Sequence, residues 1–466
     1  MKKKILVSLP YGMSARNYLK TSFINNLSKN FDITILSPLS SNKLFLNSFI
    51  KKNIIFINYP KISFVEKVFL KLKINLLTFS WLKKNHINSF EIIKNSIKQN
   101  LADDLLLKNK SLFSPVNYFL NIHIIKSCIF VISSFLDKYS KFKYLLDKNY
   151  DLVLLTHPYV PEERIISSIA NYLKIPAIAS IHSWDNITTK PYIFTKYEKI
   201  VVWNKIMKRQ LIDFYNYPNN DIFISGMIQS DLAHNYKSNI NKKKYLKLRN
   251  VPSNRKVISY ACGCSEFVPN QYLIVKFLAE LVNSNKLIYD CALVIRSHPG
   301  IFDKKIEEIA SLPNVYLDVP SPAFNPNNVD PNFWINDSSD IKNFNDFLFF
   351  SDVVINCFST TTIDAALFDK PIINIYFDAD GDTDYLASVK KHYDWNHYSP
   401  IVKSNGVCMA KSYSHLIFLI NRYLNNPKFK RLGRLKIVNE QVEKFDGKSS
   451  LSLSNFINDF LKNKTC

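Results

Sequence analysis

The sequence predicts an α/β protein with two domains, each built around a parallel sheet. Short apolar, β-branched runs such as Val353–Ile355 recur along the chain and alternate with helical patterns. Strands that are buried on both faces of a parallel sheet have this composition. With 466 residues, the chain is also longer than a single hydrophobic core usually supports. Its 47% of hydrophobic residues is enough for two such cores.

The first predicted domain, 1–235, opens with a strand–helix–strand unit of the Rossmann-like type. Ile5–Leu9 and Ile33–Leu36 are expected to be its strands, with a helix between them. Gly12 lies in the turn after the first strand. A single glycine does not make a dinucleotide-binding fingerprint, so we expect its loop to line a cleft.

Residues 61–148 predict a helical insertion in this domain. The segment is basic and rich in aromatic residues, with helical patterns in Phe64–Leu70 and Asn121–Leu136. Cationic helices with bulky apolar faces suit an anionic membrane surface. The solvated faces of ordinary core helices explain the same pattern, and we favour that interpretation. A membrane surface stays open as the second interpretation.

Regular alternation resumes after the insertion and completes the first domain. The expected strands are 152–155, 177–181, 199–203 and 222–225, and the expected helices are 162–173 and 205–214. The polar, Lys- and Asn-rich stretch 236–254 then predicts a linker between the domains.

A second series of strands and helices forms the second predicted domain, 255–430. The expected strands are 256–260, 292–295, 315–317, 353–355 and 372–375, and the expected helices are 271–282, 344–350 and 363–367. The Pro- and Asn-rich loop 320–337 is long for a compact domain, which favours a functional role. Helices within 431–466 are expected to close the chain.

The overall charge limits the classes of partner. A net charge of +23 and a pI near 9.4 favour an anionic partner. The lysines are spread through the chain, however, without an Arg-rich strip, a zinc-finger spacing or a compact basic helix. Nucleic acid is therefore a poor candidate, and an anionic lipid or substrate is a better one.

The cysteines and the apolar runs limit the class of cofactor and the compartment. The seven cysteines are scattered, and Cys262 and Cys264 are too close in sequence for a metal pair, so we expect no metal and no cofactor. Ser8 and Pro10 interrupt the first apolar run, which argues against a signal peptide. Because no run approaches the roughly 18–20 residues of a membrane span, we expect a cytoplasmic protein.

Polar residues follow the predicted strands of the first domain where each strand ends. His157 follows the strand 152–155, and His182 and Asp185 follow the strand 177–181. The carboxyl ends of parallel strands share one edge, so we expect these residues to face a cleft between the domains. His182 is the preferred general base, since its ordinary pKa lies near neutral pH. Asp185 is expected to orient or replace it, and His157 is the third candidate. A histidine that is hydrogen-bonded in a turn is the structural alternative.

The second domain offers groups that suit a phosphate. Arg296 and His298 follow one strand and supply a permanent and a titratable cation. Ser359, Thr360 and Thr361 lie where a helix is expected to begin, and the free N–H groups of such a helix start favour an anion. Two structural alternatives are a buried arginine that pairs with a carboxylate and a helix that is only well capped.

The order of these motifs is similar to that in one enzyme family. The shared elements are a histidine after a first-domain strand, a Gly-x-x-x-x-Asp element, an Arg-x-His-Pro turn, and a hydroxyl-rich helix start followed by a Lys-Pro strand. The corresponding residues are His182; Gly226 and Asp231; Arg296, His298 and Pro299; and Asp352, Ser359, Thr360, Asp364, Lys370 and Pro371. Over about 151–385, the chain resembles the GT-B glycosyltransferases, in particular the CDP-glycerol glycerophosphotransferase-like and surface-polysaccharide transferases.

The resemblance implies a GT-B-like fold, with two Rossmann-like domains that face a central cleft and a helical insertion in the first. It also implies transfer of a sugar from a nucleotide-sugar donor to a glycan or lipid-linked acceptor of surface polysaccharide or lipopolysaccharide assembly. Arg296, His298 and Ser359–Thr361 would hold the nucleotide diphosphate. Asp364 would bind a ribose or sugar hydroxyl. The residues expected on the acceptor side or in adjoining loops are Gly12, Asn186, Gly226 and Asp231.

Two departures from the family pattern bear on the donor. Ser183 stands where a glycine commonly follows the histidine, and Cys357 and Phe358 replace an acidic residue before the hydroxyls. Both departures disfavour CDP-glycerol and favour a nucleotide sugar. The paired glutamates of many retaining members are also absent, so the resemblance favours an inverting, metal-independent reaction. The alternatives are a CDP-glycerol-type glycerophosphotransferase, a nucleotide-sugar 2-epimerase, and a non-enzymatic scaffold held peripherally at the inner face of a membrane.

Overall fold

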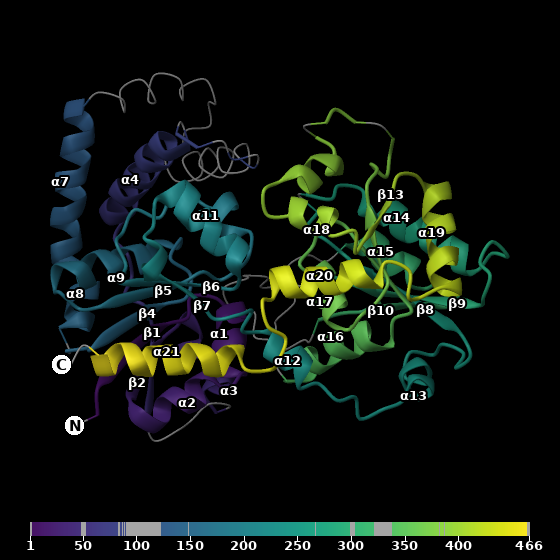
Figure 1. The fold of residues 1–466 in the computed structure, drawn as a ribbon, viewed down its shortest axis with the longest axis horizontal. Coiled ribbons are helices and arrows are strands. Elements are labelled where there is room, and N and C mark those ends of the chain that lie inside the picture. Colours follow the sequence, from purple (N-terminus) through teal and green to yellow (C-terminus); the bar gives the residue numbers. More distant parts are fainter. Residues whose placement is uncertain are drawn as a thin grey trace. The chain divides into compact units, whose positions relative to one another are not determined.

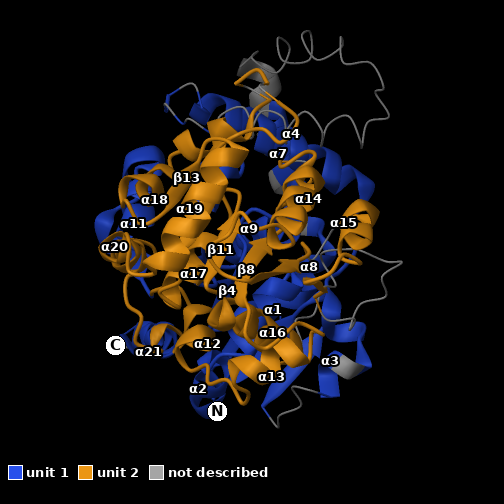
Figure 2. Cartoon of the chain, turned by 90° about the vertical axis from the view of Figure 1, so that its right-hand side faces the viewer, with its two compact units in different colours: residues 1–225, 451–466 blue, residues 226–450 orange. Residues whose placement is uncertain are grey.

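The structure is a computed structural model. It describes residues 2–47, 53–82, 84–85, 87, 89, 123–147, 149–265, 267–298, 303–320, 338–381, 383–385 and 387–463. The chain divides into two compact units, shown in Figure 2: unit 1 is Met1–Ser225 with Leu451–Cys466, and unit 2 is Gly226–Ser450. The first crossing between the units lies before the predicted boundary at 235, and the chain returns to unit 1 for its last helix.

Unit 1 is built on a parallel sheet with the strand order β3-β2-β1-β4-β5-β6-β7 (Figure 1). Its strands are β1 (Lys4–Ser8), β2 (Asp32–Leu36), β3 (Ile54–Ile57), β4 (Leu152–Leu155), β5 (Ala177–Ser180), β6 (Lys199–Val202) and β7 (Ile222–Ile224). The sequence prediction did not include β3. That strand lies at the sheet edge, where its side chains are only partly buried, and lysines and asparagine precede it, so its pattern is weak.

The order of unit 1 strands reverses direction at the centre of the sheet. β1 pairs with β2 on one side and with β4 on the other, so that Ser8 lies opposite both Leu36 and Leu155. Open parallel sheets bind ligands outside the carboxyl ends of the strands at such a switch point. We call the ends of β1 and β4, at Ser8 and Leu155, the unit 1 switch point.

Unit 2 has a parallel sheet with the strand order β10-β9-β8-β11-β12-β13. Its strands are β8 (Lys256–Ala261), β9 (Cys291–Arg296), β10 (Val315–Asp318), β11 (Val353–Asn356), β12 (Ile372–Ile375) and β13 (Cys408–Ala410). Here the order reverses between β8 and β11, whose last residues, Ala261 and Asn356, lie opposite each other. We call these two ends the unit 2 switch point.

Helices cover both sheets, as expected for alternating strands and helices. Those of unit 1 are α1 (Gly12–Leu19), α2 (Phe23–Asn30), α3 (Lys43–Asn47), α4 (Phe64–Leu82), α7 (His123–Tyr139), α8 (Lys141–Leu146), α9 (Pro161–Tyr172), α10 (Asn186–Thr189), α11 (Lys205–Tyr215) and most of α21 (Ser449–Asn463). Those of unit 2 are α12 (Ser230–His234), α13 (Lys242–Lys247), α14 (Gln271–Val282), α15 (Lys304–Ile309), α16 (Ser338–Phe350), α17 (Thr361–Leu367), α18 (Ser399–Lys403), α19 (Tyr413–Asn425) and α20 (Arg431–Gln441).

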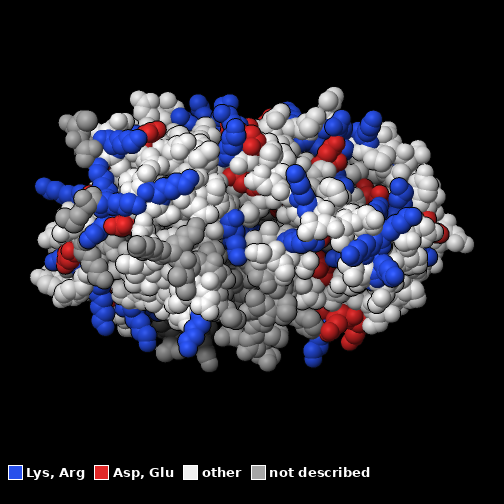
Figure 3. All heavy atoms as spheres, turned by 90° about the horizontal axis from the view of Figure 1, so that it is seen from below, with Lys and Arg blue, Asp and Glu red and all other residues white. Residues whose placement is uncertain are grey.

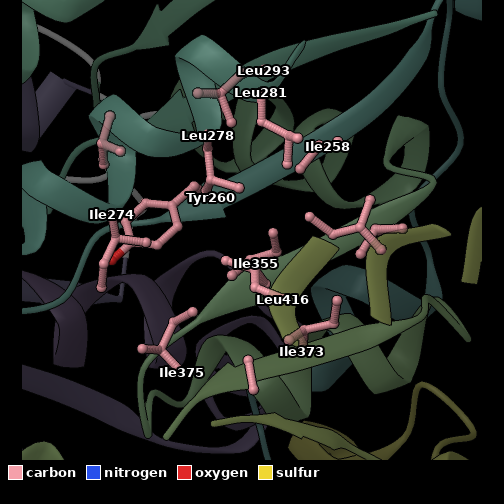
Figure 4. Close-up of a cluster of buried hydrophobic side chains, with 14 of the residues drawn as sticks. Ile258, Tyr260, Ile274, Leu278, Leu281, Leu293, Ile355, Ile373, Ile375 and Leu416 are labelled. Carbon is pink, nitrogen blue, oxygen red and sulfur yellow. The ribbon is translucent and has the colours of Figure 1, made fainter. Parts of the chain in front are cut away.

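One cluster of buried, mainly aliphatic side chains forms a large part of the core of unit 2 (Figure 4). Ile258 and Ile355, from the two central strands, meet Leu278 of α14 and Leu416 of α19, and all four side chains are completely buried. Truncating one such side chain to alanine usually costs about 2–5 kcal/mol. This cluster therefore fixes the strand ends that form the unit 2 switch point.

The described part of the predicted insertion is helical. α4 and α7 pack together through Leu76 and Ile129, and Lys73 Nζ donates a hydrogen bond to Ser133 Oγ at 3.3 Å between the same helices. Residues 83, 86, 88, 90–122 and 148 of the predicted insertion lie outside the described residues.

The predicted linker 236–254 is an ordered part of unit 2. It contains α13, whose Tyr245 ring lies 4.6 Å from the Phe350 ring of α16, and Lys242 forms an ion pair with Asp352. Lys243, Lys244 and Lys247, three of the lysines that suggested a linker, are exposed on this short helix. Their polarity therefore reflects exposure to solvent. Residues 321–337 of the predicted functional loop lie outside the described residues.

Surface charge and helix hydropathy bear on the expected partners. On the face drawn in Figure 3, Lys and Arg side chains are scattered and interspersed with Asp and Glu. Nucleic-acid backbones are usually bound along a continuous basic strip, which the described part of this face does not show.

Within the described ranges, no helix is long and apolar enough to cross a membrane, and no cluster of three His, Cys, Asp or Glu side chains could hold a metal ion.

Candidate functional site

The unit 1 switch point brings together both histidines that the sequence singled out. His157 follows β4, and its ring lies 5.3 Å from the ring of His182, which follows β5. On another side His157 meets the edge of Tyr11, 4.9 Å away, in the turn before Gly12 and α1. Ser14 Oγ, in the first turns of α1, lies 3.4 Å from His182 Nδ1. The residues that follow β4 and β5 and the first turns of α1 thus meet at His182.

Burial keeps the His182 imidazole neutral at pH 7. Desolvation lowers the pKa of His182 to about 4, Arg16 and Lys190 lower it further by repulsion, and Asp185 opposes them. The sequence argument assumed an ordinary pKa near neutrality, which burial shifts. A neutral imidazole can accept a proton, as a general base must.

His157 is buried, as His182 is. Its pKa lies well below the usual value, first because of desolvation and then because of repulsion from His182 and Lys190. Its Nδ1 is buried and has no hydrogen-bond partner within the described residues. His157 is therefore a second neutral imidazole that packs against His182.

Asp185 and Asn186 lie at the start of α10, directly after His182 in the chain. The Asp185 carboxylate accepts a hydrogen bond from Thr189 Oγ1 at 2.9 Å and from Asn186 Nδ2 at 3.3 Å. Asn186 is buried, and its Oδ1 has no partner among the described residues. Asp185 thus stabilises its own short helix, and its effect on His182 is the electrostatic one described above.

Glu163, which the sequence did not single out, lies beneath this cluster. It is completely buried in the first turn of α9 and accepts hydrogen bonds from Ser8 Oγ and from the N–H groups of Thr156 and His157. Desolvation raises the pKa of Glu163 to about 8, although those hydrogen bonds oppose the rise. The sequence offers no signal for it, because glutamates at a helix start are common on solvated surfaces.

Gly226 and Asp231 organise the start of α21. Asp231 accepts hydrogen bonds from the N–H groups of Ser449 and Ser450 at 3.0 and 2.8 Å, and from Ser450 Oγ at 2.6 Å. Gly226 has φ +87°, and a Cβ there would lie 2.4 Å from Ser449 Oγ. This packing accounts for the Gly-x-x-x-x-Asp element without a substrate.

Arg296, at the end of β9, is engaged by two buried carboxylates. Its Nη1 and Nη2 each lie 2.6 Å from a carboxylate oxygen, of Asp318 and of Asp340 respectively. All three side chains are buried. The geometry matches the structural alternative of a paired, buried arginine, so any effect of Arg296 on a phosphate would act through the strand end that it holds.

His298, two residues on, lines a small pocket at the ends of β8 and β9. Gly263, Gln271 and Ser297 line the same pocket. Gln271 fixes the loop after β8, since it accepts a hydrogen bond from Gly263 N–H at 3.0 Å and donates one to Gly263 O at 2.9 Å. Burial lowers the pKa of His298, so it offers a neutral ring rather than the cation that the sequence suggested.

The hydroxyl-rich stretch after β11 begins α17, as predicted. Thr361 is the first residue of that helix, and its N–H donates a hydrogen bond to Ser359 Oγ at 3.2 Å. Ser359, Thr360, Thr361 and Asp364 are all half-buried. These side chains are therefore partly exposed at the unit 2 switch point. The N–H groups that the sequence analysis expected to be free are engaged within the turn, because Ser359 N–H donates to Asn356 Oδ1 and those of Thr362–Asp364 donate to Ser359 O and Thr360 O.

A buried network of neutral polar groups supports this helix start. Asn356 Oδ1 accepts hydrogen bonds from Thr362 Oγ1 at 2.9 Å and from Asn374 Nδ2 at 3.0 Å. The Tyr398 hydroxyl lies 2.9 Å from Thr362 Oγ1 and donates to Asn374 Oδ1 at 3.1 Å. The network ties β11, β12 and the residue before α18 together beneath α17.

An aromatic cluster beside the same helix start was not predicted. The His392 ring stacks on Phe358 with 3.9 Å between centroids, and Trp395 meets it edge-on at 4.0 Å. Burial lowers the pKa of His392 to about 3. The sequence feature that could have revealed this cluster is the aromatic run within 392–398. The sequence alone does not indicate which strand end such a run covers.

Comparison with known proteins identifies similar folds. No protein family model and no curated protein matches the sequence. A candidate UDP-N-acetylglucosamine 2-epimerase from Listeria monocytogenes matches with a TM-score of 0.57 and 12% identity, over 99% of this chain and 98% of that one. The Neisseria meningitidis 2-epimerase bound to UDP-GlcNAc gives 0.51 and 13%, over 98% and 100%. A variant of the wall teichoic acid polymerase TagF gives 0.50 and 12%, over 100% and 90%.

These matches span nearly the whole of each chain, so the fold is the predicted GT-B-like pair of parallel α/β units with helices on both sheets. The similar structures are enzymes of more than one kind. At this identity a shared fold does not define the reaction, because one fold serves many chemistries. None of these three structures is described as a CDP-glycerol transferase.

Proposed function

We propose that the protein is a glycosyltransferase that moves a sugar from a nucleotide-sugar donor to a cell-surface polysaccharide or lipopolysaccharide acceptor. The observation that carries the proposal is the neutral, buried His182 at the unit 1 switch point, in contact with Ser14 and His157. The crystallised 2-epimerase from Neisseria meningitidis binds UDP-GlcNAc, which supports a nucleotide sugar as the ligand of this fold.

Unit 2 would hold the donor. The hydroxyls at Ser359–Thr361 would bind the diphosphate, and His298 would donate a hydrogen bond from its neutral ring. Asp364 would bind a ribose or sugar hydroxyl. Arg296 would act only through the end of β9, because Asp318 and Asp340 occupy its guanidinium.

Unit 1 would supply the base for a single displacement with inversion and without a metal. The acceptor hydroxyl would transfer its proton to His182 while its oxygen attacks the anomeric carbon. The bond from that carbon to the diphosphate oxygen would break, and the nucleoside diphosphate would leave with the electron pair. An anionic substrate near Arg16 and Lys190 would offset their repulsion and raise the pKa of His182 from about 4 toward its ordinary value.

The test is a panel of nucleotide sugars with lipid-linked and glycan acceptors, read by release of the nucleoside diphosphate. His182→Ala should lower turnover by about 10²–10⁴-fold, which is the usual contribution of a general base. The matched control is His415→Ala, a half-buried histidine on α19 of unit 2, which should leave turnover unchanged. If no donor is consumed or bound with suitable acceptors present, the proposal fails.

A nucleotide-sugar 2-epimerase is the second candidate, because the similar structures include such enzymes. An epimerase needs no acceptor, so incubation with UDP-GlcNAc alone separates the two. Acceptor-independent release of an epimerised sugar would establish the epimerase, whereas acceptor-dependent transfer would establish the transferase. Adding CDP-glycerol to the panel tests the glycerophosphotransferase, and the complete absence of turnover would leave the scaffold interpretation.

We also propose a peripheral association with the inner face of an anionic membrane. One face of α7 supports it, since Val131, Phe135 and Tyr139 are 69%, 58% and 73% exposed at a helical spacing. Sedimentation with vesicles of anionic and of neutral phospholipid tests it. Binding to the anionic vesicles alone, lost in a Phe135→Ser variant, would support this association, and equal recovery in the supernatant with both vesicles would refute it.

A further inference from the structure

Glu163 joins the ends of the two central strands of unit 1. Its Oε1 accepts hydrogen bonds from Ser8 Oγ at 2.6 Å, at the end of β1, and from Thr156 N–H at 3.1 Å, after β4. Its Oε2 accepts one from His157 N–H at 2.8 Å. The carboxyl group thus bridges the switch point from below, and two successive amides of the turn after β4 point at it.

Further hydrogen bonds close this bridge into a ring. Thr156 Oγ1 donates to Ser8 O at 2.7 Å, so β1 and β4 are linked in both directions. Ser8 Oγ also lies 2.6 Å from the Tyr59 hydroxyl, in the segment after β3. A buried polar group keeps its place only when its donors and acceptors are satisfied, and this ring satisfies both oxygens of Glu163.

The position of His182 depends on this ring through His157. The backbone of His157 is held by Glu163, and its ring fills the space between Tyr11 and His182. A change in the turn after β4 would therefore move the His157 ring, against which the His182 ring packs.

We propose that Glu163 is a positioning residue for His182. By holding Ser8 and the Thr156–His157 backbone together at the unit 1 switch point, it sets where the His157 ring lies, and so the place and basicity of His182. The proposal rests on the proposed role of His182 as the base of the transfer reaction.

The hydrogen-bond pattern explains why an acid suits this position. Both oxygens face backbone N–H groups, so an amide would turn its own N–H₂ toward one of those donors in either orientation. When Glu163 is protonated, the direction of its hydrogen bond with Ser8 must reverse. The acid then donates to Ser8 Oγ, and Ser8 Oγ donates to the Tyr59 hydroxyl, which is possible because either of those two hydroxyls can be the donor. The raised pKa of Glu163 agrees with that neutral form at pH 7.

Other titratable groups surround Glu163. The groups that interact electrostatically with Glu163 are Tyr59, Tyr18, Tyr197 and Glu162. The groups that interact in the same way with the neighbouring His182 are Arg16, Asp185 and Lys190. A shift of the pKa of His182 in a Glu163 variant must therefore be compared with a variant that changes charge nearby but keeps the ring.

Glu163→Gln tests the proposal, with Glu162→Gln as the matched control on the same turn of α9. The imidazole signals of His182 are followed by NMR against pH, assigned by their loss in His182→Ala, and transfer kinetics are measured on the same samples. Glu163→Gln should move the titration of His182 by about half a pH unit or more. It should lower kcat by about tenfold or more at a nearly unchanged KM for the donor, because the donor groups lie in unit 2. Glu162→Gln should leave both unchanged.

Ser8→Ala is the second variant, and it removes the two hydrogen bonds that Ser8 Oγ makes, with Glu163 and with Tyr59, without touching the two amides. Ser8→Ala should shift the titration of His182 in the same direction by a smaller amount. If Glu163→Gln does not fold, this variant alone tests whether the ring positions His182. An unchanged titration of His182 in folded Glu163→Gln, or in Ser8→Ala, would overturn the proposal. A wild-type protein that transfers no sugar would instead refute the proposed function, and the titrations would still decide whether Glu163 positions His182.

Discussion

The two switch points of this protein are held together by hydrogen bonds to different kinds of side chain. In unit 1 a carboxyl group, Glu163, bridges the ends of β1 and β4. In unit 2 amides and hydroxyls, centred on Asn356 and Asn374, bridge β11 and β12 beneath α17. Among the described residues of these two networks, only the first contains a carboxyl group, and burial raises its pKa to about 8. We infer that protonation acts on the geometry of unit 1, whereas the neutral amides and hydroxyls of the unit 2 network respond little to pH near neutrality.

The charges of the two sites differ in a related way. In unit 2 the buried cation Arg296 is paired with Asp318 and Asp340, and the helix start of α17 presents hydroxyls. In unit 1 the cations Arg16 and Lys190 depress the pKa of His182. A bound anion would therefore change the chemistry of unit 1 more than that of unit 2.

The largest effect on stability is expected from breaking the ion cluster of unit 2. Arg296→Leu would leave two buried carboxylates without their cation, which costs about 3–5 kcal/mol. Denaturant unfolding measures this, and the control is Arg431→Ala, which breaks an exposed pair with Asp369 worth about 0–1 kcal/mol. Equal losses in the two variants would contradict the structural role of Arg296.

The next effect should appear as a pH dependence that belongs to unit 1. The pKa of Glu163 is raised to about 8, so the folded chain keeps a proton that the unfolded chain releases near 4.5. This contribution to stability is fully present below pH 4.5 and is lost as the pH rises through 8. Its slope is at most about 1.4 kcal/mol per pH unit. The free energy of unfolding, measured from pH 5 to 8, should be flatter in Glu163→Gln, and an unchanged slope would show that the group is ionised.

A smaller loss, without pH dependence, is expected in the neutral network of unit 2. Asn374→Leu would leave Asn356 Oδ1 and the Tyr398 hydroxyl short of one partner each, at a cost of about 1–3 kcal/mol. The loss should be the same at pH 5 and pH 8. If the loss of unfolding free energy varied with pH, the proposed difference between the two switch points would be wrong.

The smallest effect should follow from removing the cap of α21. Asp231→Ala would free the N–H groups of Ser449 and Ser450, which costs about 0.5–2 kcal/mol at a helix start. Amide hydrogen exchange should quicken first in the opening turn of α21. Asp231→Asn is the matched variant. Because Oδ1 and Oδ2 of Asp231 each accept a hydrogen bond from a backbone N–H group, an amide can keep only one of these two bonds, so this variant should recover only part of the protection.

Much of the fold followed from local pattern, because buried parallel strands carry β-branched runs that few other structures need. The convergence of His157 and His182 followed as well, since residues after neighbouring parallel strands share one edge. The partners of Arg296 could not be foreseen, because Asp318 and Asp340 are separated from it by 22 and 44 positions and only the folded sheet selects them. Glu163 was missed for the opposite reason, since its local pattern is that of an ordinary, solvated helix start.

The short strand β3 and the helix α13 show a further limit. Both lie in segments rich in Lys and Asn, where half-buried elements differ from loops by only a few apolar positions. At these places a polar sequence indicates which side of an element is exposed to solvent, but it does not indicate whether the segment forms a strand or a helix.

The last helix has a consequence for how the chain is made. Residues 451–463 belong to unit 1, where Phe456 stacks on Phe223 at 4.0 Å and Leu461 O accepts a hydrogen bond from Lys3 Nζ at 2.6 Å. During synthesis, the first 225 residues must therefore wait for the whole of unit 2 to emerge before their own fold is complete. A fragment that stops at Ser225 would expose Phe223, so producing unit 1 alone calls for α21 to be grafted on or supplied as a peptide.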